Sequence, residues 1–85
     1  MTEQRSAWRA NDVVAYEAMR DAADTAIALL LRLSREGAFL ASRAHSEAAA
    51  IRRQVFEVDG FDRDAVNATR LALEERIGTL SGSLP

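Results

Sequence analysis

The feature that most constrains the fold of this chain is the stretch from Val13 to Val58, which contains no proline and only one glycine, Gly37. On a helical wheel of about 100° per residue, its apolar side chains stay within one arc of about 140°, and most charges lie opposite. The arc keeps its phase across Gly37, and no capping side chain follows that glycine at once. Since a glycine inside a helix costs only about 1 kcal/mol relative to alanine, we predict one continuous helix over about residues 12–58.

A clear turn follows this stretch and introduces a second, shorter helix. Gly60 marks the turn, and Asp62 is well placed to accept hydrogen bonds from the first free N–H groups of the next helix. The short connection predicts that a helix over about residues 62–80 runs antiparallel to the end of the long one. Residues 1–10 are expected to be flexible or semi-ordered, and residues 81–85 are expected to form a tail.

The length of the predicted helix limits how the chain can bury its apolar arc. A helix of 46 residues spans about 70 Å, whereas a compact domain of this size has a radius of gyration of about 12 Å. The favoured solution is a single all-helical domain over residues 1–85 that packs as a helical dimer. The alternative is a three-helix bundle that is broken near Gly37.

In the dimer, the shorter helix covers less than half of the long one, so a second copy is expected to cover the rest. Small residues in the middle of the arc would let another helix backbone approach closely. The predicted oligomer interface consists of Tyr16, Met19, Ala23, Ile27, Leu30, Leu33, Gly37, Ala41, Ala44 and Ala48.

Composition excludes several classes of protein. Without cysteine the chain has neither disulfides nor thiolate metal ligands. No signal-peptide core and no run of about 20 apolar residues is present, and a net charge of −2 gives no general attraction to nucleic acid or anionic lipid. All 11 basic residues are arginine, which indicates a GC-rich, bacterial-like composition. We therefore expect a cytoplasmic protein that binds neither membranes nor nucleic acid.

Candidate chemical groups are sparse. His45 is the only histidine, with no second metal-ligand type clustered around it, and no phosphate-binding loop or recognisable nucleophile occurs. We therefore predict no catalytic, cofactor-binding or metal-binding residues. Phe39 projects from the charged face of the predicted helix, while Arg20 and Arg52 border the apolar arc, so these three side chains are candidate contacts with a partner or an anion.

Three short segments together resemble the all-helical chorismate mutases. They are Met19-Arg20-x-x-Ala23-Asp24, Leu30-Leu31-x-Leu33, and Gly60-Phe61-Asp62 followed by Val66. The resemblance implies an intertwined dimer with one long helix and two shorter ones. Of the cationic positions that this family uses along its long helix, only Arg20 matches, and the others hold Gly37 and Ala48. The similarity thus supports a related architecture better than it supports catalysis.

Two functions remain open on the sequence alone. The leading hypothesis is a non-catalytic helical interaction protein, such as a small regulator, an antitoxin-like inhibitor or an assembly subunit, that acts through homo-oligomerisation and contacts with a protein partner. The alternative is a small helical enzyme, similar in architecture to chorismate mutases, that binds an anionic substrate with arginines from two subunits.

Overall fold

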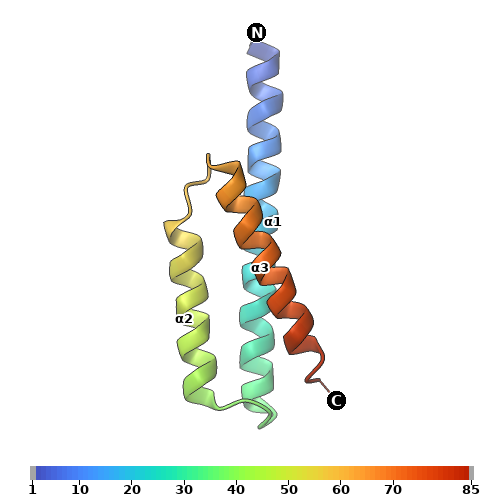
Figure 1. The fold of residues 1–85 in the computed structure, drawn as a ribbon, viewed down its shortest axis with the longest axis vertical. Helices are drawn as coiled ribbons and strands as arrows, with labels where there is room; N and C mark the ends of the chain where they lie inside the picture. Colours follow the sequence, from blue (N-terminus) through green and yellow to red (C-terminus); the bar gives the residue numbers. More distant parts are fainter. Residues whose placement is uncertain (1, 85) are drawn as a thin grey trace.

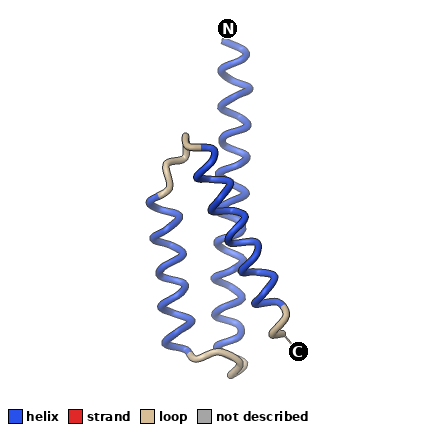
Figure 2. The backbone as a smooth tube through the Cα atoms, in the orientation of Figure 1, coloured by secondary structure: helices blue, strands red, loops and turns tan. Residues whose placement is uncertain are grey.

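A computed structural model describes residues 2–84, and this part of the chain consists of three α-helices joined by short loops (Figures 1 and 2). Helix α1 spans Thr2–Arg35, α2 spans Ala41–Glu57, and α3 spans Arg63–Ser81. Successive helices run in opposite directions along the bundle (Figure 1). The all-α prediction is confirmed, and the architecture is the three-helix bundle that is broken near Gly37.

The preferred prediction of one continuous helix over residues 12–58 is therefore wrong, and Gly37 is the reason. Its φ angle is +77°, a left-handed conformation that glycine adopts without a Cβ clash. The Ala38 N–H donates to the Leu33 carbonyl at 2.9 Å, and the Gly37 N–H donates to the Ser34 carbonyl at 3.1 Å. These two bonds form a Schellman motif, so Gly37 ends α1.

Helix α2 begins without a capping side chain. Its N-cap residue, Leu40, makes no side-chain hydrogen bond to the first turn, so packing has to stabilise this helix. Ala44, Ala48 and Ile51 are buried within the bundle. Because the apolar arc keeps its phase on both sides of Gly37, its two halves face each other once the chain folds back.

The first helix also begins earlier than expected. The backbone is helical from Thr2, so the predicted start near residue 12 is too late. The N-terminal turns of α1 extend beyond the loop between α2 and α3 (Figure 1). The bundle is elongated as a result, with extents of 54 × 23 × 16 Å and a radius of gyration of 15.2 Å, compared with about 12 Å for a compact domain of this length.

The predicted start of the third helix is confirmed to within one residue. Asp62 is the N-cap of α3, and its side chain accepts a hydrogen bond from the Ala65 N–H at 3.1 Å. The preceding loop is fixed by the Phe61 N–H, which donates to the Asp59 carboxylate at 3.0 Å. Residues 82–84 continue α3 as a hydrogen-bonded turn, and Pro85 of the predicted tail lies outside the described residues.

Both α2 and α3 pack mainly on α1, which forms the centre of the core. The core consists of the buried side chains of Met19, Ala22, Ala23, Ala26, Leu30, Leu33, Ala44, Ala48, Ile51, Val66, Leu73 and Leu80.

Candidate functional site

Exposed apolar side chains gather at the end of the bundle where the loop between α2 and α3 passes α1. Val13 is 59% exposed, Phe56 88% and Phe61 80%. Tyr16 lies among them, because it lines one groove with Val13 and Phe61 and a second groove with Phe56. We call these four residues the Tyr16 surface. Single exposed apolar residues are ordinary on protein surfaces, whereas clustered ones mark interaction sites.

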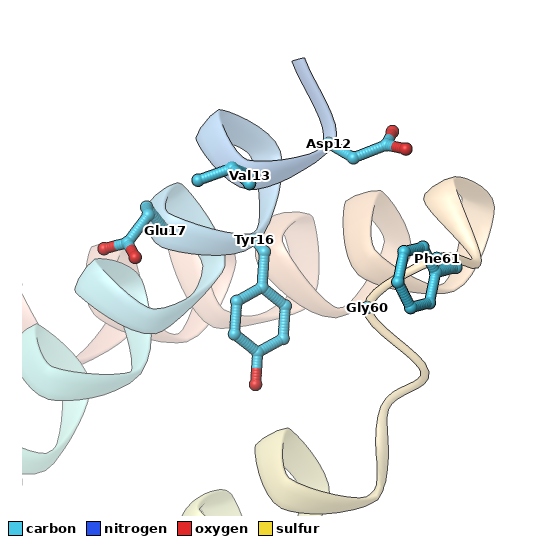
Figure 3. A pocket seen from close by; sticks show the side chains of 6 residues that line it. All are labelled: Asp12, Val13, Tyr16, Glu17, Gly60 and Phe61. Carbon is cyan, nitrogen blue, oxygen red and sulfur yellow. The ribbon is translucent and has the colours of Figure 1, made fainter. Parts of the chain in front are cut away.

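The first groove, of about 610 Å³, lies between α1 and the loop (Figure 3). Asp12, Val13, Tyr16, Glu17, Gly60 and Phe61 line it. The loop passes close to the tyrosine here, since a Cβ added at Gly60 would lie in ordinary van der Waals contact with the Tyr16 ring, at 3.4 Å. Gly60 itself does not have a positive φ; among the described glycines, only Gly37 does.

An ion pair holds the loop and α3 against α1 beside this groove. Arg63 donates two hydrogen bonds to one carboxylate oxygen of Asp12, from Nη2 at 2.8 Å and from Nε at 3.2 Å. The Asp12 side chain is only 9% exposed. Helical periodicity does not predict this pair, because the two residues are 51 positions apart.

The second groove, of about 250 Å³, lies between α1 and α2 and contains two of the predicted contact residues. Arg20 from α1 and Arg52 from α2 both line it, with Tyr16, Asp24 and Phe56 among their neighbours. Both arginines are exposed, and within the described residues neither has an ion pair. The structure thus brings Arg20 and Arg52 together at the edge of the Tyr16 surface.

The third predicted contact residue lies at the opposite end of the bundle. Phe39 belongs to the connection between α1 and α2, is partly buried, and packs against the core. The Arg43 guanidinium lies 5.3 Å from the centroid of its ring, a distance that allows a cation–π interaction. Phe39 therefore has partners within the chain and is remote from the two arginines.

Most of the predicted interface residues are buried within a single chain. Met19, Ala23, Leu30, Leu33, Ala44 and Ala48 belong to the core, Tyr16 and Ile27 are partly buried, and Gly37 and Ala41 are exposed. The small residues of α2 thus let α2 approach α1 of the same chain closely. The dimer remains a prediction, and the exposed apolar residues are the ones that a partner would have to cover.

The remaining candidate group from the sequence, His45, is not among the residues that line these two grooves. His45 is exposed on α2, and no group of three or more potential metal-ligating side chains occurs in the part of the chain that was described. In the same part, no helix combines the length and apolar character that a membrane span requires.

Comparisons of the chain with protein-family models, with curated proteins and with solved structures found no match. The grooves and the exposed side chains around Tyr16 are therefore the features of the molecule that bear on its function.

Proposed function

We propose that this protein is a non-catalytic helical interaction module that acts through homo-oligomerisation and protein–protein contacts. The supporting observation is the Tyr16 surface, in which exposed Val13, Phe56 and Phe61 surround a partly buried tyrosine beside two grooves. Burying a large apolar side chain that is now exposed is worth about 1.5–3 kcal/mol. Aromatic residues are also enriched at the centres of interfaces.

The proposal is tested with exposed apolar residues on and off this surface. Val13→Asp and Leu71→Asp form a matched pair, because both residues are helical and they are 59% and 57% exposed. Phe61→Asp and Leu40→Asp form a second pair, because both residues lie in loops.

We expect Val13→Asp and Phe61→Asp to abolish self-association, measured by light scattering, and the binding of partner proteins, measured by pull-down. Leu71→Asp and Leu40→Asp should leave self-association and partner binding unchanged. Circular dichroism checks that each variant remains helical. If the four variants associate like the natural chain, the Tyr16 surface is not the interaction site.

A second candidate function is the binding of an anionic ligand, as in the enzyme hypothesis. The observation that favours it is the shared groove of Arg20 and Arg52. Two further positions have cationic residues in the family that the chain resembles. Here they hold Gly37, which ends α1, and the buried Ala48, and this argues against catalysis. Titration with inorganic phosphate and with malonate, followed by NMR, should shift groove resonances in the natural chain and not in Arg20→Ala or Arg52→Ala if this candidate is correct.

A further inference from the structure

We infer that the Tyr16 surface and the second groove together bind an amphipathic helix of a different protein, and that a carboxylate of this helix pairs with Arg20 and Arg52. The inference rests on the proposed function and names the kind of partner that its protein–protein contacts involve. Three features of the molecule support it: the continuity of the two grooves along α1, the two arginines without a counter-ion, and the all-helical fold.

The two grooves follow one face of α1. Tyr16 lines both of them, and the residues that α1 contributes recur every three or four positions, which places them on the same side of a helix. They are Asp12, Val13, Tyr16, Glu17, Arg20, Ala23, Asp24 and Ile27. From Val13 to Ile27 this face is about 21 Å long, or about four helical turns. A small anion in the second groove would leave Val13 and Phe61 exposed, whereas a helix along the face covers both grooves.

Two cations in the second groove have no carboxylate to neutralise them. Arg20 and Arg52 are both exposed, and among the described residues neither makes an ion pair. Asp24 lines the same groove without pairing with either of them. Because two like charges that share a groove repel each other, a carboxylate from outside the chain is attracted by both guanidinium groups. Each guanidinium can donate two hydrogen bonds to it.

The first groove has the opposite charge, and this determines where the partner carries its carboxylate. Asp12 is neutralised by Arg63, whereas Glu17 is exposed and has no ion pair within the described part of the chain. An acidic side chain placed there would meet a like charge. The partner should therefore be apolar where it covers Val13 and acidic about two turns away, since Val13 and Arg20 are about 10 Å apart along α1.

The fold favours a helix over an extended segment as the bound element. Residues 2–84 form three helices and no strand, so this part of the chain offers no sheet edge to which a strand could be added. The other common mode of recognition places the apolar face of an amphipathic helix in a groove, with apolar side chains at positions i, i+3, i+4 and i+7. The continuous face along α1 suits this mode.

Selection from a displayed peptide library tests the inference. The library consists of helices of about 20 residues with a fixed apolar stripe and randomised polar positions. Against the natural chain, we expect enrichment of helices with aspartate or glutamate about two turns from a bulky apolar residue. Against Arg20→Glu and Arg52→Glu, lysine or arginine should replace that acid. Enrichment without a preference at this position, or no enrichment at all, would overturn the inference.

Arg53→Glu is the matched control for Arg52→Glu. Both arginines are exposed on α2 and lack an ion pair among the described residues, but Arg53 lines a different groove, between α2 and α3. Glutamate and arginine have similar helix propensities, and circular dichroism checks that each variant remains helical.

Fluorescence anisotropy of the most enriched acidic helix gives the affinities. The dissociation constant should rise about tenfold or more in Arg52→Glu and less than about twofold in Arg53→Glu. Replacing the acid of the bound helix by lysine should restore binding to Arg52→Glu, as expected for a direct charge pair. Equal losses in the two variants would show that net charge, and not the groove, governs binding, and would overturn the inference.

Self-association provides a further readout, because it is proposed for the same surface. The enriched helix should dissociate oligomers of the natural chain in light scattering. Oligomers that persist with the helix bound would place the helix elsewhere and overturn the inference.

The outcomes separate this inference from the function on which it rests. If Val13→Asp and Phe61→Asp abolish partner binding while Arg20→Glu and Arg52→Glu bind like the natural chain, the acidic helix is overturned and the proposed function stands. If none of these four variants alters partner binding or self-association, both are overturned. If phosphate or malonate shifts the groove resonances while no helix is enriched, the inference is overturned in favour of the second candidate function.

Discussion

Arg76 donates two hydrogen bonds to the Glu47 carboxylate, from Nε to Oε2 at 2.7 Å and from Nη2 to Oε1 at 2.8 Å. The pair joins α3 to α2, two helices that pack mainly on α1 rather than on each other. Both side chains are about one-third exposed. This bidentate ion pair therefore links α2 to α3 where few other contacts join these two helices.

Glu47→Gln is expected to lower the free energy of unfolding by about 0.5–1 kcal/mol. This is the upper part of the range for exposed ion pairs, because a bidentate pair is stronger than a single contact. Glu74→Gln is the control, since Glu74 pairs with Arg70 within α3 and such pairs contribute about 0.2–0.5 kcal/mol. Urea unfolding followed by circular dichroism measures both. An equal loss in the two variants would show that the link between helices adds nothing beyond a local pair.

The same pair predicts a dependence on pH. The hydrogen bond from Arg76 holds the pKa of the Glu47 carboxyl below its ordinary value of 4.5. A depressed folded-state pKa stabilises the fold above the unfolded-state pKa, and this contribution is lost as pH falls through the folded-state value. The stability difference between the natural chain and Glu47→Gln should therefore be constant near neutral pH and shrink below a pH of about 4.5. Urea unfolding at a series of pH values checks it, and a difference that grows in acid would contradict it.

Local signals were sufficient to predict the all-α class and the start of α3. The Asp62 cap depends on contacts between residues three apart, and such contacts can be recognised in sequence. The break after α1 was harder to predict, because the constant phase of the apolar arc fits a continuous helix and a folded hairpin equally well. The left-handed conformation of Gly37 ends α1 and so produces the hairpin. The start of α2 has no sequence signal of its own, because its N-cap residue, Leu40, has no capping side chain.

The candidate site was predicted only in part. Arg20 and Arg52 were selected because they border the apolar arc, and the hairpin brings them to one groove. The Asp12–Arg63 and Glu47–Arg76 pairs join residues that are 51 and 29 positions apart. Both depend on how the helices pack, which helical periodicity does not specify. Phe56 and Phe61 could have been found as large aromatic residues on either side of the turn.

Two glycine substitutions should have opposite effects on stability. Gly37→Ala introduces no steric contact, yet it forces alanine into a φ of +77°, which costs about 1–2 kcal/mol. Gly78→Ala lies within α3 and also has space for a Cβ, so it should stabilise the protein by about 0.4–1 kcal/mol. Thermal unfolding of both variants measures the difference. A stabilised Gly37→Ala variant would instead support a helix that continues through this position.

Two leucine substitutions should separate the core from the surface. Leu30 is fully buried on α1, whereas Leu71 on α3 is 57% exposed. Leu30→Ala should therefore cost about 2–5 kcal/mol through lost contacts and a residual cavity, and Leu71→Ala less than about 0.5 kcal/mol. Chemical denaturation reports both values. Comparable losses would mean that a second chain covers Leu71, contrary to its role as the control off the Tyr16 surface.

Asp12→Asn is the sharpest test of the contact that positions the loop between α2 and α3. The amide keeps an oxygen that can accept from the Arg63 guanidinium but loses the negative charge. Two hydrogen bonds between opposite charges thus become bonds from a charged donor to a neutral acceptor, and stability should fall by about 1 kcal/mol. Asp64→Asn, an exposed residue in the first turn of α3, should cost a few tenths of a kcal/mol through the helix dipole. Because Asp12 lies beside Val13 and Phe61 in one groove, Asp12→Asn should also weaken self-association, whereas Asp64→Asn should not. Urea unfolding measures the stability of each variant, and analytical ultracentrifugation of the same samples measures self-association. If Asp12→Asn is destabilised but has the dissociation constant of the natural chain, the ion pair supports the fold without shaping the Tyr16 surface.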